Sequence, residues 1–524
     1  MVSTDGMDFA LLVDADPISF EEASKEEKWR VAMNQEIDAI ERNKIWELTD
    51  LPKDKTVLGI RSIYKIKLDS NGKVDKNKAR IVVKGYRHKF GVDYEEIFAP
   101  VTRLETVRLF LSLAAQNGWK VHQMDVKSAF LNGYLEEEVY VEQPLGYKKK
   151  GEEHKVYRLK KALYGLKQAP RTWYNRIDNF FLKNGFKRCP YEHPLYTKED
   201  KEGNFLIICL YVDDLIFTGN NKKLGMDFKK SMMEEFEMTD LRLLHYFLGI
   251  GVKQIEEGII ISQQKYAKDL LKKFRMDSVV PCTTPMETNL KLRKDDKSEE
   301  VDASIYRSLV GSLMYLTATR PDLMFAVSML SRFMTLPKKS HWEAGKRILH
   351  YVVGTVDHGI HYKRKQEPIL IGYSDSDWGG DANDYKSTSG YVFNIGSGAV
   401  SWSSKKQSIV DLSSTEEEYI AWSAAGCQAL WLRWMLQEMK CSQEKETMLY
   451  CDNNSAIALS KNPVFHGRSK HIRIKYHYIR DLSKNREIMV KYCKTQHQLA
   501  DIFTKALKAE IFVNMKEKLG VTQI

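Results

Sequence analysis

Residues 205–217 read Phe-Leu-Ile-Ile-Cys-Leu-Tyr-Val-Asp-Asp-Leu-Ile-Phe, with two apolar runs on either side of adjacent carboxylates. Neither run is long enough to cross a membrane, so each predicts a buried β-strand. The reversal at Asp213-Asp214 predicts a hairpin with both acids at its tip. Paired carboxylates repel each other in an apolar setting, and a hard divalent cation removes that cost. The pair predicts half of a metal site for phosphoryl transfer, although Asp-Asp is also a common turn dipeptide.

A third carboxylate, Asp125, lies in a stretch that begins as an alternating strand at Val121 and ends in the turn dipeptide Asn132-Gly133. An acid at a strand end can meet the hairpin acids across a sheet. Two Mg²⁺ ions roughly 3.5–4 Å apart need at least two shared carboxylates, and nucleotidyl transfer uses this arrangement. One ion lowers the pKa of the attacking hydroxyl, and the other stabilises the leaving pyrophosphate.

Further motifs occur in a fixed order along the chain. They are Ser19–Ala23, Lys78–Val82, Phe98–Val101, Met124–Gly133, Leu163–Arg171 and Tyr211–Asp214. With these motifs the chain resembles the copia-type (Pseudoviridae-like) long-terminal-repeat retrotransposon polyproteins, in their reverse transcriptase and ribonuclease H region. The resemblance extends from about residue 19 nearly to the C-terminus. It implies an RNA- and DNA-directed DNA polymerase that binds an RNA template, a DNA primer and deoxynucleoside triphosphates. Two Mg²⁺ ions per active site are implied, with Mn²⁺ as the alternative.

The resemblance implies a role for each matching residue. Asp125 and Asp213 match metal ligands, with the backbone of Val126 beside them, and Asp214 matches a less essential neighbour. Phe130 matches the aromatic residue that stacks beneath the incoming sugar and excludes a 2′-hydroxyl; ordinary core packing is the alternative. The implied substrate-binding residues are Lys67, Arg80, Phe130, Gly165, Lys167, Gln168 and Arg171.

Apart from Phe130, these substrate contacts belong to two segments. The loop from Gly165 to Pro170 is expected against the nascent base pair, because glycine permits close backbone approach and nearby polar side chains can reach phosphates. Lys67 and Arg80 lie on a basic alternating stretch that would hold the triphosphate. A solvated charged hairpin is the alternative for this stretch, and Lys78 competes with Arg80 in the register.

A second set of acids lies towards the C-terminus. Asp375 follows an apolar strand, Glu416 begins a helix with serine and threonine as cap candidates, Asp452 ends another strand and Asp501 lies in a further helix. The order strand, helix, strand, helix resembles ribonuclease H, whose acids hold two Mg²⁺ ions around one phosphate of an RNA–DNA hybrid. The local text that carries this resemblance is Ser387–Tyr391, Trp402–Gln407, Cys451–Ala456 and Ser469–Ile472.

Some of these assignments have competitors. Glu418 competes with Glu416, because helical geometry places only one of them on the catalytic face. Asp501 is alternatively a surface helix acid. His477 and His497 are either structural histidines or groups that assist product release.

Composition bounds the class of protein. The 524 residues have room for three or four domains, and 29% charged with 43% hydrophobic residues is typical of a folded protein. The net charge of +11 suits a polyanionic partner. Seven cysteines without a C-x-x-C pair suggest neither a zinc knuckle nor a disulfide framework and fit a reducing compartment.

The resemblance implies a cytoplasmic location, in a virus-like particle, with the nucleus as an alternative. Secretion is not expected, because residues 1–15 carry three acids and no basic region of a signal peptide. No apolar run reaches transmembrane length, so no membrane partner is expected.

The expected fold is an α+β or α/β multidomain protein, a right-hand polymerase with fingers, palm and thumb, followed by a connection and a ribonuclease H-like domain. Helices are expected at Phe20 to about Asn43, Phe228–Phe236 and Gln263–Phe274, and a flexible linker at Lys291–Glu300. The expected limits are 1–18 for a disordered leader, 19–255 for fingers and palm, 256–290 for a thumb-like segment, 291–368 for linker and helical connection, 369–508 for the ribonuclease H-like domain and 509–524 for a C-terminal helix or tail.

Several positions depart from the family pattern. Arg242 stands where a glycine is expected and Asp411 where relatives often have a small apolar residue. A catalytically inactive, nucleic-acid-binding remnant of a decayed retroelement is therefore the alternative to an active enzyme. A host factor that uses only one of the two sites is a third hypothesis.

Overall fold

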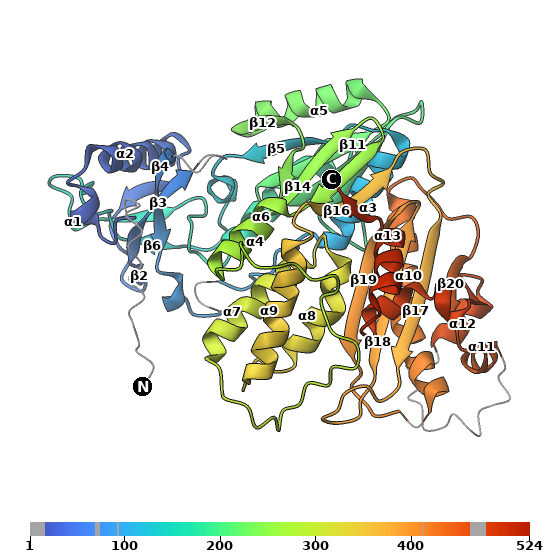
Figure 1. Cartoon of the computed structure of the whole chain (residues 1–524). Helices are drawn as coiled ribbons and strands as arrows, with labels where there is room; N and C mark the ends of the chain where they lie inside the picture. Colours follow the sequence, from blue (N-terminus) through green and yellow to red (C-terminus); the bar gives the residue numbers. More distant parts are fainter. Residues whose placement is uncertain (1–15, 69–73, 92–93, 412, 462–477) are drawn as a thin grey trace.

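The computed structural model shows a mixed α/β protein with several sheets, and it describes all residues except 1–15, 69–73, 92–93, 412 and 462–477 (Figure 1). Helices α1 (Phe20–Ala23) and α2 (Glu27–Arg42) and strands β2 (Val57–Leu58) to β4 (Val74–Val83) lie at one end of the molecule and the C-terminal sheet at the other, whereas α3 (Leu104–Asn117) lies between them beside β16 (His358–Lys363) (Figure 1). Among the described residues, no helix is both long enough and apolar enough to span a membrane.

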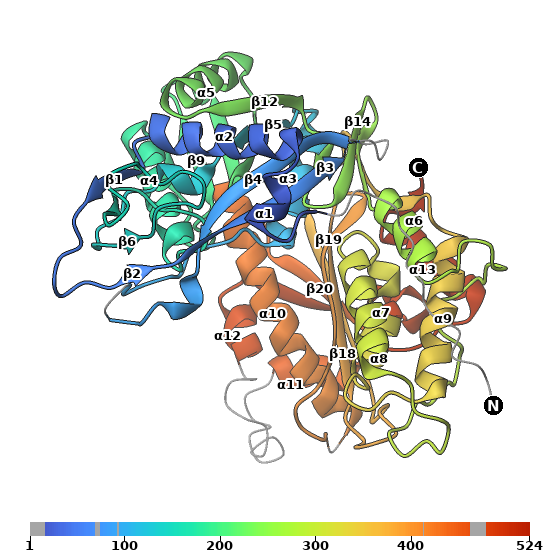
Figure 2. The same ribbon diagram turned by 90° about the vertical axis from the view of Figure 1, so that its left-hand side faces the viewer.

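The helix expected from Phe20 to about Asn43 is interrupted, so that prediction is wrong in part. The chain forms a short α1 (Phe20–Ala23) and then α2 (Glu27–Arg42). The Ser24 hydroxyl donates to the Glu21 carbonyl at 3.0 Å, and serine competes in this way with continued helix. The buried face of α2 packs on the hairpin of β3 (Ile60–Leu68) and β4 (Val74–Val83), as Figure 2 shows. A small sheet beside it has the order β1 (Trp46–Thr49), β7 (Val156–Leu159), β6 (Tyr140–Val141) and β2 (Val57–Leu58).

The hairpin predicted around the paired acids is confirmed as β10 (Phe205–Tyr211) and β11 (Asp214–Gly219). It lies inside a six-stranded sheet with the order β12 (Met238–Leu243), β5 (His122–Val126), β11, β10, β9 (Leu195–Glu199) and β8 (Lys187–Arg188). Alternate side chains of β10 enter two different cores. Leu206 and Ile208 face the core under α4 (Ala169–Lys183) and α5 (Lys222–Glu235), whereas Ile207 faces the core of α3 (Leu104–Asn117). Burial on both faces explains the uninterrupted apolar sequence.

Helix α5 begins at Lys222, six residues before the expected Phe228. The Asn221 side chain accepts hydrogen bonds from the Lys223 and Leu224 amides. This N-cap satisfies two of the unpaired donors at the helix start, which the apolar spacing alone does not reveal.

A third sheet joins segments that are distant in sequence. Its order is β13 (Tyr246–Phe247), β14 (Ile250–Ile255), β15 (Gly258–Ser262), β16 (His358–Lys363) and β22 (Val521–Gln523). The expected domain limit after residue 255 falls in the turn of the β14–β15 hairpin. The C-terminal segment, expected as a helix or tail, forms α13 (Ala509–Lys518) and then the edge strand β22.

The helix expected at Gln263–Phe274 is confirmed as α6 (Gln264–Lys273), and the segment 291–368, expected to be partly helical, contains α7 (Ala303–Leu316), α8 (Met324–Ser331) and α9 (Lys339–Val353). The segment expected to be a flexible linker, 291–300, has no helix or strand but has tertiary contacts. Leu292 is buried, the Arg293 carbonyl lies 3.0 Å from His341 Nε2, and the Lys294 amide donates to Asn383 at 2.7 Å.

The C-terminal sheet has the order β19 (Gly398–Lys406), β18 (Thr388–Ile395), β17 (Leu370–Asp377), β20 (Thr447–Cys451) and β21 (Ile488–Tyr492). The first three strands are antiparallel, and β20 and β21 run parallel to β17. The long helix α10 (Ser414–Glu438) packs on β17 and β18. Two short helices, α11 (Asn454–Lys461) and α12 (Tyr478–Lys484), complete this region.

One hydrophobic core continues from α3 through the third sheet and the helices α7, α8 and α9 to α10. The buried Arg108 of α3 links this helix to the C-terminal sheet and to the segment after α7. Its guanidinium donates to the carbonyls of Val400 at 2.8 Å and Ala318 at 3.0 Å and lies 3.9 Å from the ring centroid of Trp402. The acid-bearing hairpin and the C-terminal sheet are thus parts of one packed body.

Candidate metal centres

Three carboxylates meet where the neighbouring inner strands β5 and β11 pair, next to the turn between β10 and β11. Asp125, Asp213 and Asp214 each offer an oxygen, and these oxygens all lie within 4.8 Å of one another. Asp214 stands opposite Asp125 in the pairing of β11 with β5. The Val126 amide donates to the Asp213 carbonyl at 2.9 Å. Pairing of the strands therefore brings these residues, the first acid group, together as the sequence suggests.

The first acid group carries electrostatic strain. Burial, and then Asp213, raises the pKa of Asp125, while Lys78 and Lys76 act in the opposite direction. Burial, followed by Asp125 and Asp213, raises the pKa of Asp214 to about 6. Gln123 Nε2 donates to Asp214 at 3.3 Å and offsets this shift in part. Hard cations with oxygen ligands relieve this repulsion, so the geometry and charge fit Mg²⁺ or Mn²⁺.

The loop that contains Gly165 packs on β4. Gly165 has φ +88°, and a Cβ built there would lie 2.2 Å from the Val83 carbonyl oxygen. The Val83 amide donates to the Tyr164 carbonyl at 2.8 Å. The close backbone approach expected at Gly165 is therefore an approach to the protein itself.

Tyr164 links two of the expected substrate residues. The Arg80 guanidinium lies 4.4 Å from its ring centroid, and the half-buried Phe130 ring lies 5.4 Å away on a tilted plane. Phe130 lies five residues after Asp125, in the 3₁₀ turn Ala129–Asn132. Its ring packs against two cores. Arg80, Tyr164 and Phe130 thus form a row of neighbouring side chains.

The polar residues after Gly165 contact other protein groups. Lys167 Nζ lies 3.3 Å from both the His88 carbonyl and the Tyr94 hydroxyl. Gln168 is buried. Arg171 pairs with Glu96 at 2.9 Å and donates to the Phe98 carbonyl at 3.2 Å. Phosphate contacts by Lys167, Gln168 and Arg171 would require these side chains to exchange partners, and their substrate role stays a prediction.

The basic hairpin gives a register for the lysines. Lys67 stands opposite Lys76, and Lys65 opposite Lys78, so these side chains share one face with Arg80. Lys78 and Lys76 both lower the pKa of Asp125, which places their charges near the first acid group. Lys76 was not singled out in the sequence, although the two-residue period with Arg80 is a signal that could have found it.

Gly165→Ala should lower the melting temperature markedly, because the new methyl group would collide with the Val83 carbonyl. It should also weaken any primer extension. Gly151→Ala is the matched control: Gly151 has φ +81°, but nothing lies within 4 Å of the added Cβ. Both variants incur the left-handed backbone cost, so thermal melts of the two isolate the steric effect. Equal melting temperatures would contradict the role of the close contact.

Asp214→Asn should raise the free energy of unfolding in metal-free buffer by about 1–2 kcal/mol, after allowance for solvent screening, and the melting temperature should rise with it. The raised pKa of Asp214 means that its ionisation costs stability above about pH 6, and this cost disappears as the pH falls below the ordinary aspartate range. The gain should therefore be larger at pH 8 than at pH 4. Mg²⁺ should stabilise this variant less than the wild type.

Thermal melts with and without Mg²⁺ at the two pH values test the Asp214→Asn expectation. Asp227→Asn, which removes an exposed acid from α5, controls for loss of one negative charge. A lower melting temperature for Asp214→Asn in metal-free buffer at pH 8 would argue against repulsion among the three acids.

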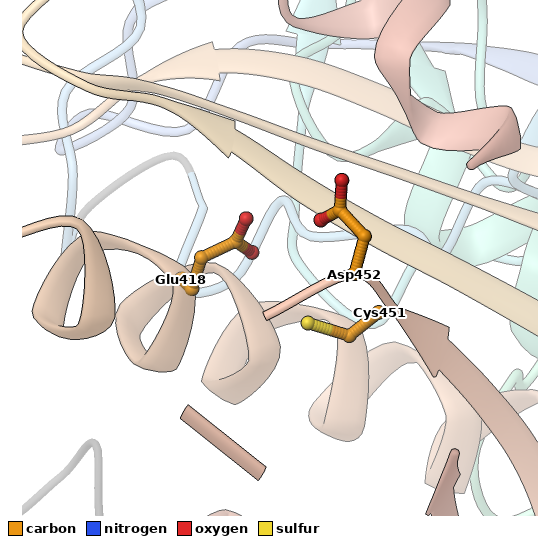
Figure 3. A group of neighbouring side chains, drawn as sticks. All are labelled: Glu418, Cys451 and Asp452. Atoms are coloured by element: carbon orange, nitrogen blue, oxygen red, sulfur yellow. The ribbon is translucent and has the colours of Figure 1, made fainter. Parts of the chain in front are cut away.

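The second acid group lies at the C-terminal sheet. Asp375 on β17, Asp452 directly after β20 and Asp501 in a 3₁₀ helix have oxygens within 4.8 Å of one another. Asp452 also has an oxygen within 4.8 Å of ligand atoms of Glu418 on α10 and of Cys451. All five of these residues make up the second acid group. Figure 3 shows the Glu418 carboxylate reaching from the helix towards Asp452, with the Cys451 sulfur beside them.

Glu418, and not Glu416, is the α10 acid that the structure brings to this site. Within the described part of the chain, the groups of close potential ligands do not include Glu416. Residues two positions apart point roughly 200° apart around a helix. The Glu416 backbone amide donates to the Ser413 hydroxyl, which caps the start of α10. The geometry therefore favours Glu418 over Glu416 as a ligand at this site.

Lys505 partly neutralises the second acid group. Its Nζ lies 3.0 Å from Asp501 and 3.7 Å from Asp375, and the Thr504 hydroxyl donates to Asp375. Burial raises the pKa of Asp375, and the Asp452 charge adds to the shift while Lys505 opposes it. Burial, and then Asp375 and Asp452, holds the pKa of Glu418 far above its usual range. The i, i+4 spacing of Asp501 and Lys505 could have revealed this pair from the sequence.

Oxygen donors dominate the second acid group. Burial raises the pKa of the Cys451 thiol, with the Glu418 charge adding to the effect, so the protonated sulfur is a poor ligand. The carboxylates left fit a hard cation such as Mg²⁺ or Mn²⁺. His497 is exposed in the 3₁₀ turn Thr495–His497, whereas His477 and the motif Ser469–Ile472 lie outside the described residues.

Three converging acids on one sheet, joined to a second acidic centre, are typical of enzymes that act on phosphodiesters. The family profile described as "Reverse transcriptase (RNA-dependent DNA polymerase)" matches residues 43–288, which contain the whole first acid group. The chain is 40% identical over 516 residues to the Retrovirus-related Pol polyprotein from transposon RE1 of Arabidopsis thaliana, with 98% of this chain and 35% of that protein covered.

Two further relatives are informative. The Pol polyprotein from transposon TNT 1-94 of Nicotiana tabacum is 40% identical over 520 residues, which is 97% of this chain and 39% of that protein. The putative transposon Ty5-1 protein YCL074W of Saccharomyces cerevisiae is 34% identical over 300 residues, which is 57% of this chain and 97% of that protein. The chain belongs to the copia-type retrotransposon Pol polyprotein family and carries its reverse transcriptase-like region. It spans about a third of the length of the plant polyproteins.

Proposed function

We propose that the chain is an RNA- and DNA-directed DNA polymerase whose C-terminal region degrades the RNA strand of RNA–DNA hybrids. The convergence of Asp125, Asp213 and Asp214 within the family-matched region carries the polymerase part of this proposal. Its substrates would be an RNA template, a DNA primer and deoxynucleoside triphosphates. Virus-like particles in the cytoplasm, or the nucleus, would be its place of action.

In the polymerase centre, bound Mg²⁺ would supply the charge that activates the primer hydroxyl and stabilises pyrophosphate. Asp125 and Asp213, with the backbone of Val126, would hold that metal, and Asp214 would shape the site from the position fixed by Gln123. Lys76, Lys78 and Arg80 share one face of the β3–β4 hairpin, and they would bind the triphosphate. Phe130 would lie beneath the incoming sugar.

In the nuclease centre, Asp375, Glu418, Asp452 and Asp501 would hold the metal around the scissile phosphate. Support comes from the order of elements that carry these acids: strand, helix, strand and a 3₁₀ turn. Lys505 pairs with Asp375 and Asp501, and it would be displaced or rearranged as metal binds. Under this proposal residues 19–255 contain fingers and palm, 256–290 a thumb-like segment and 369–508 the ribonuclease H-like domain.

Two departures from the family pattern favour a second candidate, an inactive nucleic-acid-binding remnant. Arg242, where a glycine is expected, has a left-handed φ of 65°, which a non-glycine residue adopts at a cost. Asp411 is buried, and burial raises its pKa to about 6. Both features cost folding free energy. Neither residue belongs to an acid group, so neither departure removes a metal ligand. Extension of a primer on a homopolymer template with Mg²⁺ separates the two candidates.

Asp213→Asn and Asp452→Asn should have reciprocal effects. The first should abolish extension on RNA and DNA templates and spare hybrid cleavage, because it removes a ligand only from the first acid group. The second should lower hybrid cleavage by orders of magnitude and spare extension. Paired assays of both activities on each purified variant test this. Loss of both activities in either variant, at an unchanged melting temperature, would contradict two independent centres.

Phe130→Val should let the enzyme incorporate ribonucleotides, because the smaller side chain leaves room for the 2′-hydroxyl. If Phe130 only fills the core, the change should instead cost roughly 2–4 kcal/mol of stability and leave sugar preference unchanged. The ratio of ribo- to deoxynucleotide incorporation, measured beside a thermal melt, distinguishes these outcomes. An unchanged ratio with a lower melting temperature would refute the proposed selection at Phe130.

A further inference from the structure

The turn that carries Asp213 has an unfavourable backbone conformation. Tyr211 pairs with Asp214, so Val212 and Asp213 form a two-residue turn. Val212 has a left-handed φ of 57°, and Asp213 is not among the residues with positive φ. Positive φ at the first central position defines a type II′ turn, which favours glycine there. A β-branched residue in this region is a genuine outlier that persists only when its surroundings enforce it.

Two hydrogen bonds hold the turn from opposite sides. The Trp173 indole Nε1 donates to the Val212 carbonyl at 2.7 Å, and the Val126 amide donates to the Asp213 carbonyl at 2.9 Å. The second bond comes from the strand that carries Asp125. The first comes from a side chain of a different element, α4.

Trp173 is itself held rigidly. Its side chain is 1% exposed, and its ring packs edge-on against Phe236 with the ring centroids 5.4 Å apart. Packing fixes the direction of the indole N–H, so the hydrogen bond constrains the Val212 carbonyl and, through the next peptide unit, the direction of the Asp213 side chain.

We propose that Trp173 is a positioning residue for the polymerase metal centre. Its indole N–H holds Val212 in a conformation that valine does not prefer, and this conformation aims the Asp213 carboxylate at Asp125. The inference rests on the proposed polymerase function. It goes beyond that function by assigning a role in metal binding to a buried side chain outside the acid group.

Trp173→Phe removes the N–H but keeps an aromatic ring. Loss of one hydrogen bond should lower the extension rate at limiting Mg²⁺ by roughly five- to tenfold and raise the Mg²⁺ concentration for half-maximal extension. Hybrid cleavage at the second acid group should stay unchanged. A purely structural role would lower the melting temperature without changing the Mg²⁺ dependence.

Val212→Gly provides the decisive second variant. Glycine adopts positive φ without strain, so the turn no longer needs the indole to enforce it. In the Trp173→Phe background, Val212→Gly should restore most of the lost extension and return the Mg²⁺ dependence towards that of the wild type. Trp422→Phe is the matched control, because Trp422 is fully buried and its indole nitrogen has no hydrogen-bond partner within the part of the chain that the structure describes. This control should leave the Mg²⁺ dependence of extension unchanged.

An unchanged Mg²⁺ dependence in Trp173→Phe, or no rescue by Val212→Gly, would overturn the proposal. If the wild type does not extend primers, the proposed function fails, but positioning is still measurable. Mn²⁺ titration followed by electron paramagnetic resonance then compares the wild type, Trp173→Phe and Asp213→Asn. Weaker Mn²⁺ binding in Trp173→Phe, restored by Val212→Gly, would support the positioning role; binding equal to that of the wild type would refute it.

Discussion

Repulsion among Asp125, Asp213 and Asp214 is the constraint on which the polymerase-like half of the protein depends. Their oxygens lie within 4.8 Å of one another, and burial raises the pKa of Asp125 and Asp214. Groups held so close in partial burial separate unless a rigid scaffold keeps them together. The six-stranded sheet provides this scaffold, because alternate side chains of β10 anchor it in two separate cores.

Repulsion between carboxylates also acts in the second acid group, but a different source of positive charge offsets it. There Lys505 supplies a positive charge next to Asp375 and Asp501, whereas charge near the first acid group comes from Lys76 and Lys78 on the β3–β4 hairpin. A continuous core and the buried Arg108 join the two halves. The distance between the two centres is therefore set by packing, and a substrate that engages both must match it.

Sequence patterns predicted much of this arrangement. The apolar runs around Asp213-Asp214 predicted the hairpin, because continuous burial on two faces leaves a direct trace in composition. The strand that carries Asp125 and the succession of Asp375, Asp452 and Asp501 followed from local patterns together with a family resemblance. Long-range geometry explains the rest: no pattern near Gly165 shows that it meets Val83, and the resemblance did not reveal that contact.

The errors in the sequence-based predictions have local causes. The break at Ser24 depends on a side-chain hydrogen bond that hydrophobic spacing does not register. The choice between Glu416 and Glu418 depends on which face of α10 is turned towards β17, and packing of the helix on the sheet sets this. Trp173 was invisible as a contributor because its partner is a backbone carbonyl 39 residues away.

We propose that the first acid group binds the catalytic metal. The most direct test is a crystal structure of the chain with Mn²⁺, an RNA–DNA primer–template and a non-hydrolysable deoxynucleotide analogue, with anomalous scattering used to locate the metal. We expect Mn²⁺ bound to carboxylate oxygens of Asp125 and Asp213, next to the triphosphate. A triphosphate bound with its metal elsewhere, and no anomalous peak between these two aspartates, would contradict it.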